Sequence, residues 1–143
     1  MKLTLQKILL KIMYKPALLS GAVFALLSVV IGAFGAHYLK TIFTPETLAS
    51  FETGVKYQFY HSIALLFLGI YSRENPVYIK TIFKLFFTGI ILFSGSIYAL
   101  CLLKSTMDIG LGGLGILTPL GGMFFIAAWV LLLFSVLKIN SEK

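Results

Sequence analysis

Four long stretches of the chain are nearly free of charged residues, and a charged residue, a proline or a glycine-rich segment separates each from the next. They cover residues 17–38, 52–72, 84–103 and 119–137. A helix needs about 20 mostly apolar residues to cross the hydrocarbon core of a bilayer. The pattern therefore predicts an all-α protein. Residues 1–143 are expected to form a single integral membrane domain, a four-transmembrane-helix bundle.

The second stretch has a distinct helix start at its upstream end. Thr44 supplies a capping hydroxyl, Pro45 occupies the first helical position, and Glu46 places an acid near the positive end of the helix dipole. The next proline is Pro76. Because the uncharged part, residues 57–72, is too short to span alone, we expect this helix to begin at the surface and then enter the bilayer.

Two shorter segments have less regular patterns. The first 15 residues combine four lysines with apolar residues at helical spacing, which predicts a short N-terminal amphipathic segment on the inner leaflet. Residues 108–118 are apolar but rich in glycine, a poor helix former. This segment is either re-entrant or a surface loop, and Thr118 and Pro119 provide a new helix start after it.

The basic residues predict the orientation of the bundle. With the N terminus inside, nine Lys and Arg residues fall on the inner side, and Lys40, Lys56 and Lys104 fall on the outer side. Cytoplasmic loops of membrane proteins carry an excess of Lys and Arg. The distribution therefore predicts that both termini are cytoplasmic.

The composition supports a membrane location and excludes several other classes. Hydrophobic residues make up 59% of the chain and charged residues 12%, against about 25% charged residues in an ordinary soluble domain. The net charge of +7 has no accompanying basic groove with interleaved aromatic residues, so we expect no nucleic-acid partner. A single cysteine excludes an internal disulfide, and no metal site or cofactor is predicted.

Small residues at four-residue spacing are expected to bring the helices together, because membrane helices associate through close backbone approach. The first stretch provides Ser28, Gly32 and Ala36, and the third provides Gly95 and Ala99.

Four sequence motifs carry a family resemblance. They are Gly-Ala-Phe-Gly-Ala-His (32–37), Phe-Glu-Thr-Gly-Val-Lys-Tyr-Gln-Phe-Tyr-His (51–61), Phe-Ser-Gly-Ser-Ile-Tyr (93–98) and Thr-Pro-Leu-Gly-Gly (118–122). Together they resemble the YgdD-like family of small inner-membrane proteins, the domain of unknown function 423, which has a transmembrane protein 256 branch. The resemblance implies a four-helix integral membrane protein in the plasma (inner) membrane of a bacterium. It supplies no established reaction and no catalytic residues.

Polar side chains within the predicted spans are the candidate site residues, since such groups are costly at membrane depth. The candidate polar or ligand pocket consists of His37, Glu52, Lys56, Tyr57, Gln58, His61, Ser94 and Tyr98. Glu52 and Lys56 are spaced as a helical ion pair. We expect His37 and His61 to approach each other, because both are predicted near the outer side of consecutive antiparallel helices.

Three functions remain open at this stage. The first is a non-enzymatic accessory, scaffold or small-ligand-binding protein, because no catalytic motif is present. Whether the protein is an enzyme stays undecided. The second is an oligomeric transporter or channel that uses a polar cluster around Glu52, Lys56 and His61. The third is a haem or redox protein with His37 and His61 as ligands. The expected partners are membrane lipids, and a homo-oligomer or larger membrane complex.

Overall fold

The computed structural model describes residues 13–72, 76–106 and 112–141 of the chain. Within these ranges the structure consists of helices and turns, as the sequence predicts. The predicted amphipathic segment before residue 13 and the first part of the glycine-rich segment, residues 108–111, lie outside the described residues. The described elements are α2 (Lys15–His37), η1 (Leu39–Thr41), α3 (Pro45–Tyr71), α4 (Pro76–Thr106), η2 (Gly112–Ile116) and α5 (Leu117–Ser141).

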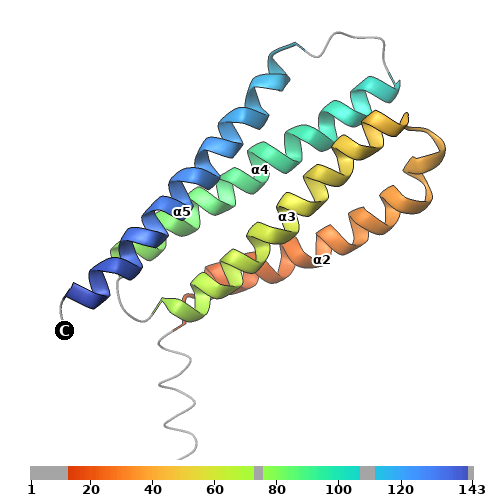
Figure 1. Cartoon of the computed structure of the whole chain (residues 1–143). Coiled ribbons are helices and arrows are strands. Elements are labelled where there is room, and N and C mark those ends of the chain that lie inside the picture. Colours follow the sequence, from red (N-terminus) through yellow and green to blue (C-terminus); the bar gives the residue numbers. More distant parts are fainter. Residues whose placement is uncertain (1–12, 73–75, 107–111, 142–143) are drawn as a thin grey trace, which may run out of the picture.

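The four long helices run antiparallel to their neighbours along the chain (Figure 1). The helices α2 and α3 pack lengthwise as one hairpin, and α4 and α5 pack as another. Contacts between α3 and α4 join the two hairpins into one bundle. A cluster of buried apolar residues from α3, α4 and α5, including Leu65, Phe86 and Phe125, fills the junction.

The predicted start of α3 is confirmed. Thr44 is the N-cap residue, and its side-chain oxygen accepts a hydrogen bond from the backbone N–H of Thr47 at 3.3 Å. Pro45 follows as the first helical residue. The first helical N–H groups have no partner within the helix, so this cap satisfies one of them.

The third long helix begins about two turns before the predicted span. That span is predicted from residue 84, whereas α4 begins at Pro76. Proline is favourable at the first helical position. The extra turns are amphipathic, because Ile79 and Ile82 are buried in the core while Lys80 is exposed. An amphipathic turn of this kind is stabilised because its apolar side packs on the core.

Within the described ranges, three helical segments are long and apolar enough to cross a membrane, judged by length and composition alone. They are Lys15–Thr41, Tyr78–Ser105 and Gly113–Lys138. The helix α3 is not among them, although its 27 residues give it a length of about 40 Å. Many large apolar side chains on α2 and α5 point outward, including Leu26 and Leu133. Lipid tails are the solvent that suits such a surface.

Glycines set the closest contacts between helices, but mostly at other positions than we expected. A Cβ atom at Gly89 would lie 2.6 Å from the Phe125 ring, and one at Gly121 would lie 2.8 Å from Phe93 Cα. Gly32 lies close to Val55, in agreement with the prediction. Gly95, in contrast, has no atom within 4 Å of where its Cβ would be, so its predicted role in packing was wrong.

Candidate functional site

A buried polar junction in the middle of the bundle is centred on Gln58, which is 4% exposed. Its side-chain nitrogen donates a hydrogen bond to the backbone carbonyl of Phe24 on α2 at 3.0 Å. Its side-chain oxygen accepts a hydrogen bond from the Tyr98 hydroxyl on α4, also at 3.0 Å. One amide on α3 therefore links three helices.

Two buried serines extend this junction. The Ser94 hydroxyl on α4 donates to the carbonyl oxygen of Gly54 on α3 at 2.8 Å, and Ser94 is fully buried. The Ser28 hydroxyl donates to the same Phe24 carbonyl that receives Gln58. Because buried polar groups are costly without partners, these contacts fix how α2, α3 and α4 meet.

His61 forms a second polar contact, between α3 and α5. Its Nδ1 lies 2.8 Å from the carbonyl oxygen of Tyr57, and its Nε2 accepts a hydrogen bond from Trp129 Nε1 at 3.3 Å. An indole N–H only donates, so Nε2 is the acceptor and Nδ1 carries the hydrogen. The ring also stacks on Phe125, with centroids 3.5 Å apart and planes 5° from parallel.

Trp129 belongs to this contact, and sequence reasoning missed it. It is the single tryptophan of the chain and lies within an apolar run, so it was counted only as part of a membrane span. A tryptophan in the interior of a span carries an indole N–H donor that needs a partner, and this is the sequence signal that identifies Trp129 as a candidate. The His61–Trp129 hydrogen bond leaves neither ring nitrogen of His61 unused.

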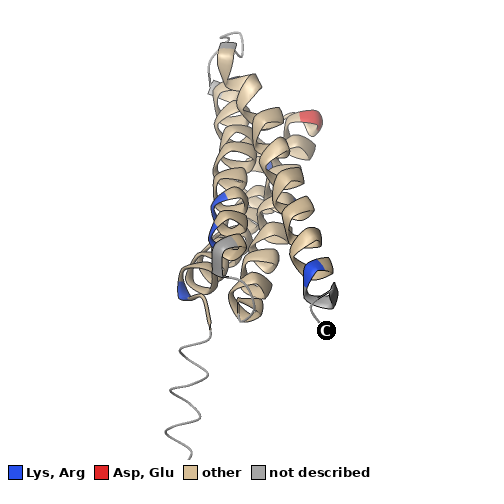
Figure 2. Cartoon of the chain, turned by 90° about the vertical axis from the view of Figure 1, so that its left-hand side faces the viewer, with Lys and Arg blue, Asp and Glu red and all other residues tan. Residues whose placement is uncertain are grey.

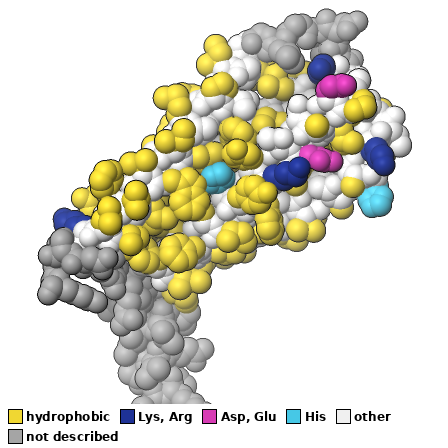
Figure 3. Space-filling model, viewed as in Figure 1, with side chains coloured by type: hydrophobic (Ala, Val, Ile, Leu, Met, Phe, Trp, Pro, Cys, Tyr) yellow, Lys and Arg dark blue, Asp and Glu magenta, His cyan; other side chains and the backbone are white. Residues whose placement is uncertain are grey.

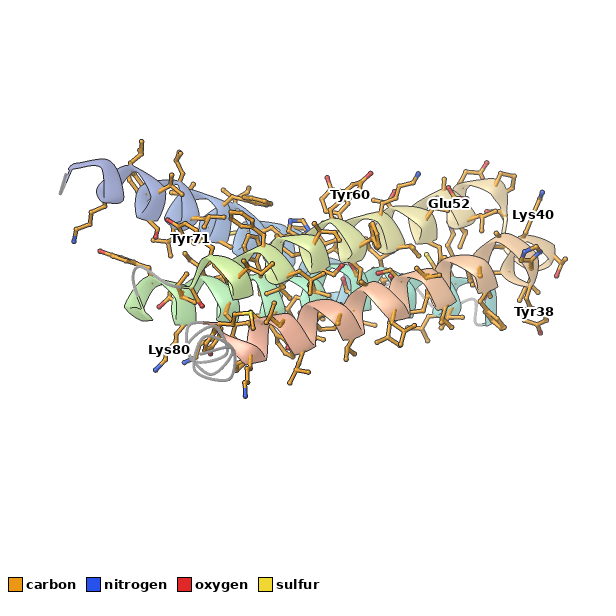
Figure 4. All side chains as sticks on the ribbon, turned by 90° about the horizontal axis from the view of Figure 1, so that it is seen from below. Tyr38, Lys40, Glu52, Tyr60, Tyr71 and Lys80 are labelled. Atoms are coloured by element: carbon orange, nitrogen blue, oxygen red, sulfur yellow. The ribbon has the colours of Figure 1, made fainter. Side chains whose placement is uncertain are left out.

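The structure does not bring His37 and His61 into one pocket. Close contacts pair Gly35 with Phe51, and Gly21 with Leu66, along α2 and α3. In this register His37 lies level with a residue near position 50, about 11 positions and about 16 Å along the helix from His61. Figure 4 shows the same separation through neighbouring residues, with Tyr38 at one end of the bundle and Tyr60 near its middle.

His37 and His61 are therefore too far apart to bind one haem iron, as the haem hypothesis requires. Axial ligands bind one iron from opposite sides, which requires two rings within a few ångströms of each other. Among the described residues, no group of three or more His, Cys, Asp or Glu side chains could hold a metal ion.

Glu52 and Lys56 form the predicted ion pair, with Lys56 Nζ 3.6 Å from Glu52 Oε2. Both side chains are more than half exposed, and they lie on the outer face of α3, away from Gln58. Tyr60, one turn further along, is exposed as well. Figure 3 shows acidic side chains toward one end of this face and mainly hydrophobic side chains over the rest. The predicted pocket is thus divided into an interior junction and an exposed polar face.

A lateral cleft of about 390 Å³ lies between α3 and α4 near the start of α5. Its volume is within the range of small-molecule sites. Four hydroxyl side chains, one thiol, one cation and three apolar side chains line it: Thr47, Ser50, Thr53, Phe93, Ile97, Leu100, Cys101, Lys104 and Thr118. None of these residues was among the predicted site residues, because their polar groups are spread over three helices and have no common spacing.

Two opposite charges lie at one end of this cleft. Lys104 is part of the lining, and Glu46 is one helical turn before Ser50 on α3. The pKa of Glu46 is lowered because its carboxylate accepts hydrogen bonds from its own backbone N–H and from the Thr44 hydroxyl, and the charge of Lys104 lowers it further. Glu46 is therefore ionised at neutral pH.

A comparison with known protein families assigns the chain to one of them. Residues 31–122 match the model of a family described as a protein of unknown function (DUF423). The chain belongs to the DUF423 family. The matched range includes α3 and α4 whole, and with them His61, the lateral cleft and the α3 and α4 residues of the Gln58 junction.

Relatives at moderate identity are named membrane proteins. The UPF0382 membrane protein SH2409 of Staphylococcus haemolyticus is 36% identical over 82% of this chain and 92% of its own length. The UPF0382 membrane protein YwdK of Bacillus subtilis is 36% identical over 87% of this chain and 98% of its own length. A UPF0382 membrane protein of Haemophilus influenzae is 33% identical over 79% of this chain and 86% of its own length. No solved structure matches the chain.

Proposed function

We propose that this DUF423 protein is a non-enzymatic, small-ligand-binding accessory protein of the bacterial plasma membrane. It crosses the membrane four times, and both termini face the cytoplasm. The observation that carries the proposal is that the interior polar groups are already hydrogen-bonded within the bundle. Gln58, Tyr98 and Ser94 bind one another or backbone carbonyls, so they hold helices together, and the lateral cleft is a space that remains for a ligand.

The distribution of charge supports the orientation. In the antiparallel bundle, the start of α2, the start of α4 and the end of α5 lie at one end, which carries Lys15, Lys80, Lys84 and Lys138. The acidic residues among those described, Glu46 and Glu52, lie toward the other end. Figure 2 shows most of the visible basic residues toward the end at which the C terminus lies. A cytoplasmic location for that end follows from the positive-inside rule.

The test is native mass spectrometry of the protein extracted in a mild detergent. We expect the intact chain to carry a small molecule at a fixed stoichiometry that survives detergent exchange. A bare chain, together with no gain in thermal stability when total membrane lipid is added back, would contradict the ligand-binding role, because a ligand that binds the folded state raises its stability.

A second candidate function is an oligomeric transporter or channel, and the exposed polar face of α3 favours it. Glu52 and Lys56 would be costly against lipid, and the helix that carries them is the long helix that does not meet the length-and-composition criterion for a span. A second copy of the chain placed against this face would cover both charges and pair them between copies.

Disulfide cross-linking in native membranes tests this candidate. In a Cys101→Ser background, Tyr60→Cys should give a covalent dimer on mild oxidation, and Val30→Cys on the exposed face of α2 serves as the control. Equal cross-linking at both positions, or none at Tyr60→Cys, would exclude an α3-to-α3 interface. Ion or proton flux into liposomes would then have to accompany the dimer for a transport role.

A further inference from the structure

The lateral cleft has a length that suits one acyl chain. Lys104, Leu100, Ile97 and Phe93 follow one another on the side of α4 that lines it. From Lys104 to Phe93 the helix rises about 16 Å, and half of the hydrocarbon core of a bilayer is about 15 Å thick. The cleft therefore extends from the Lys104 ammonium, in the last turns of α4, over a length equal to the hydrocarbon thickness of one leaflet.

The polar end of the cleft offers both acceptors and a donor. The hydroxyls of Ser50 and Thr53 donate to the carbonyl oxygens of Glu46 and Ala49, each at 3.0 Å. Their oxygen lone pairs remain to accept from a ligand, whereas the Lys104 ammonium only donates. A ligand that fits must therefore bring a charged acceptor for Lys104 together with an N–H or O–H donor.

The charges at the polar end of the cleft limit which kinds of lipid head group are complementary to it. Among the described residues Lys104 has no salt bridge, although the charge of Lys104 acts on the Glu46 carboxylate. With Glu46 ionised, the two residues sum to zero charge, so a head group that is also neutral overall but carries both signs is complementary to them.

We propose that the cleft binds one zwitterionic phospholipid whose head group combines a phosphate with a primary ammonium. The phosphate lies beside Lys104, the ammonium lies toward Glu46 and Ser50, and one acyl chain lies along Leu100, Ile97 and Phe93. This inference rests on the proposed ligand-binding function and names the ligand class of the same cleft.

The experiment titrates dioleoylphosphatidylethanolamine into the purified, delipidated chain and measures the bound fraction by native mass spectrometry. Lys104→Gln should weaken binding about tenfold, since it removes one charge-assisted hydrogen bond. Lys40→Gln, which changes another exposed lysine at the same end, should leave binding unchanged. Unfolding midpoints equal to wild type show that each variant is folded.

A second pair of variants tests the apolar part of the cleft. Leu100→Trp fills it and should abolish binding, whereas Leu102→Trp, on the outer side of the same helix turn, should have no effect. Dioleoylglycerol has the same acyl chains without a phosphate. It should bind at least tenfold more weakly than the phospholipid, and Lys104→Gln should not change its binding.

The acidic residue gives a head-group test. The wild type should prefer dioleoylphosphatidylethanolamine to dioleoylphosphatidylglycerol, and Glu46→Gln should reverse that preference. Equal weakening by Lys104→Gln and Lys40→Gln, or dioleoylglycerol binding as tightly as the phospholipid, would overturn the inference. A bound molecule that none of the cleft variants displaces would overturn the inference but leave the proposed function standing, whereas a chain that binds nothing would contradict both.

Discussion

At the residue scale, most buried polar groups in this bundle have a partner, and the partners are mainly backbone carbonyls. Such contacts are specific because a misplaced helix would leave the donor unpaired in an apolar medium. Ser94 and Ser135 show the contrast, since both are almost fully buried but Ser135 Oγ has no hydrogen-bond partner among the described residues. Hydrogen bonding, rather than polarity alone, therefore decides what each serine contributes.

The two serines give a matched prediction. Ser94→Ala should lower the free energy of unfolding by about 0.6 kcal/mol and by no more than about 1.7 kcal/mol, the range measured for hydrogen bonds between membrane helices. Ser135→Ala removes a hydroxyl without a partner and should leave stability unchanged or raised. Reversible unfolding of the two variants in the same bicelles measures both, and an equal loss in the two would contradict the hydrogen-bond account.

The His61–Trp129 hydrogen bond has an optical readout, because Trp129 is the single tryptophan of the chain. His61→Phe keeps a ring that stacks on Phe125 but removes the acceptor of the indole N–H. Tryptophan emission should move to shorter wavelength, because hydrogen bonding of the indole N–H shifts emission to longer wavelength. The matched variant Tyr57→Phe keeps the Tyr57 backbone carbonyl that His61 uses, so its emission should stay at the wild-type wavelength.

At the element scale, the helices approach each other most closely at glycines, which have no side chain. Gly121 lies against the backbone of Phe93, and Gly89 lies against the Phe125 ring, so the α4–α5 hairpin depends on both positions. Gly95 lies on the same helix as Gly89 but faces open space. The spacing of small residues therefore identifies a candidate contact face, but only the register between two helices shows which glycine is in contact.

Alanine substitutions distinguish a glycine in a helix contact from a glycine that faces open space. Gly121→Ala should destabilise the protein by about 1–3 kcal/mol, because the new methyl group forces the backbones apart. Gly95→Ala should be neutral or stabilising by less than about 1 kcal/mol, because alanine is the better helix former. Thermal unfolding in detergent compares the two variants, and similar midpoints for both would contradict the packing account.

The sequence predicted the elements better than the site. Hydrophobic stretches and the Thr44 cap located the helices, since both signals are local along the chain. The helix α4 extends upstream of the predicted span because its first turns are amphipathic and pack on the core. The expected His37–His61 contact was wrong because it needed the relative register of α2 and α3, which depends on contacts such as that between Gly35 and Phe51. The lateral cleft was missed because its lining comes from three helices.

At the scale of the whole molecule, α3 is the element on which the membrane arrangement depends. It is more polar than its neighbours and is not one of the three apolar spans, but it lies lengthwise between α2 and α4 and donates or accepts hydrogen bonds with both. A helix packed in this way shares the membrane depth of its neighbours. We therefore expect four crossings, with the Gln58 junction near the middle of the bilayer.

Fusions of a reporter that is active only in the periplasm test this arrangement most directly. The decisive pair of fusions follows Thr41, before α3, and Ser72, after it, with a third fusion after Lys143 to place the C terminus. The four-span account predicts strong activity after Thr41 and none after Ser72 or Lys143. Equal activity after Thr41 and Ser72 would mean that α3 does not cross the membrane, and would contradict the account.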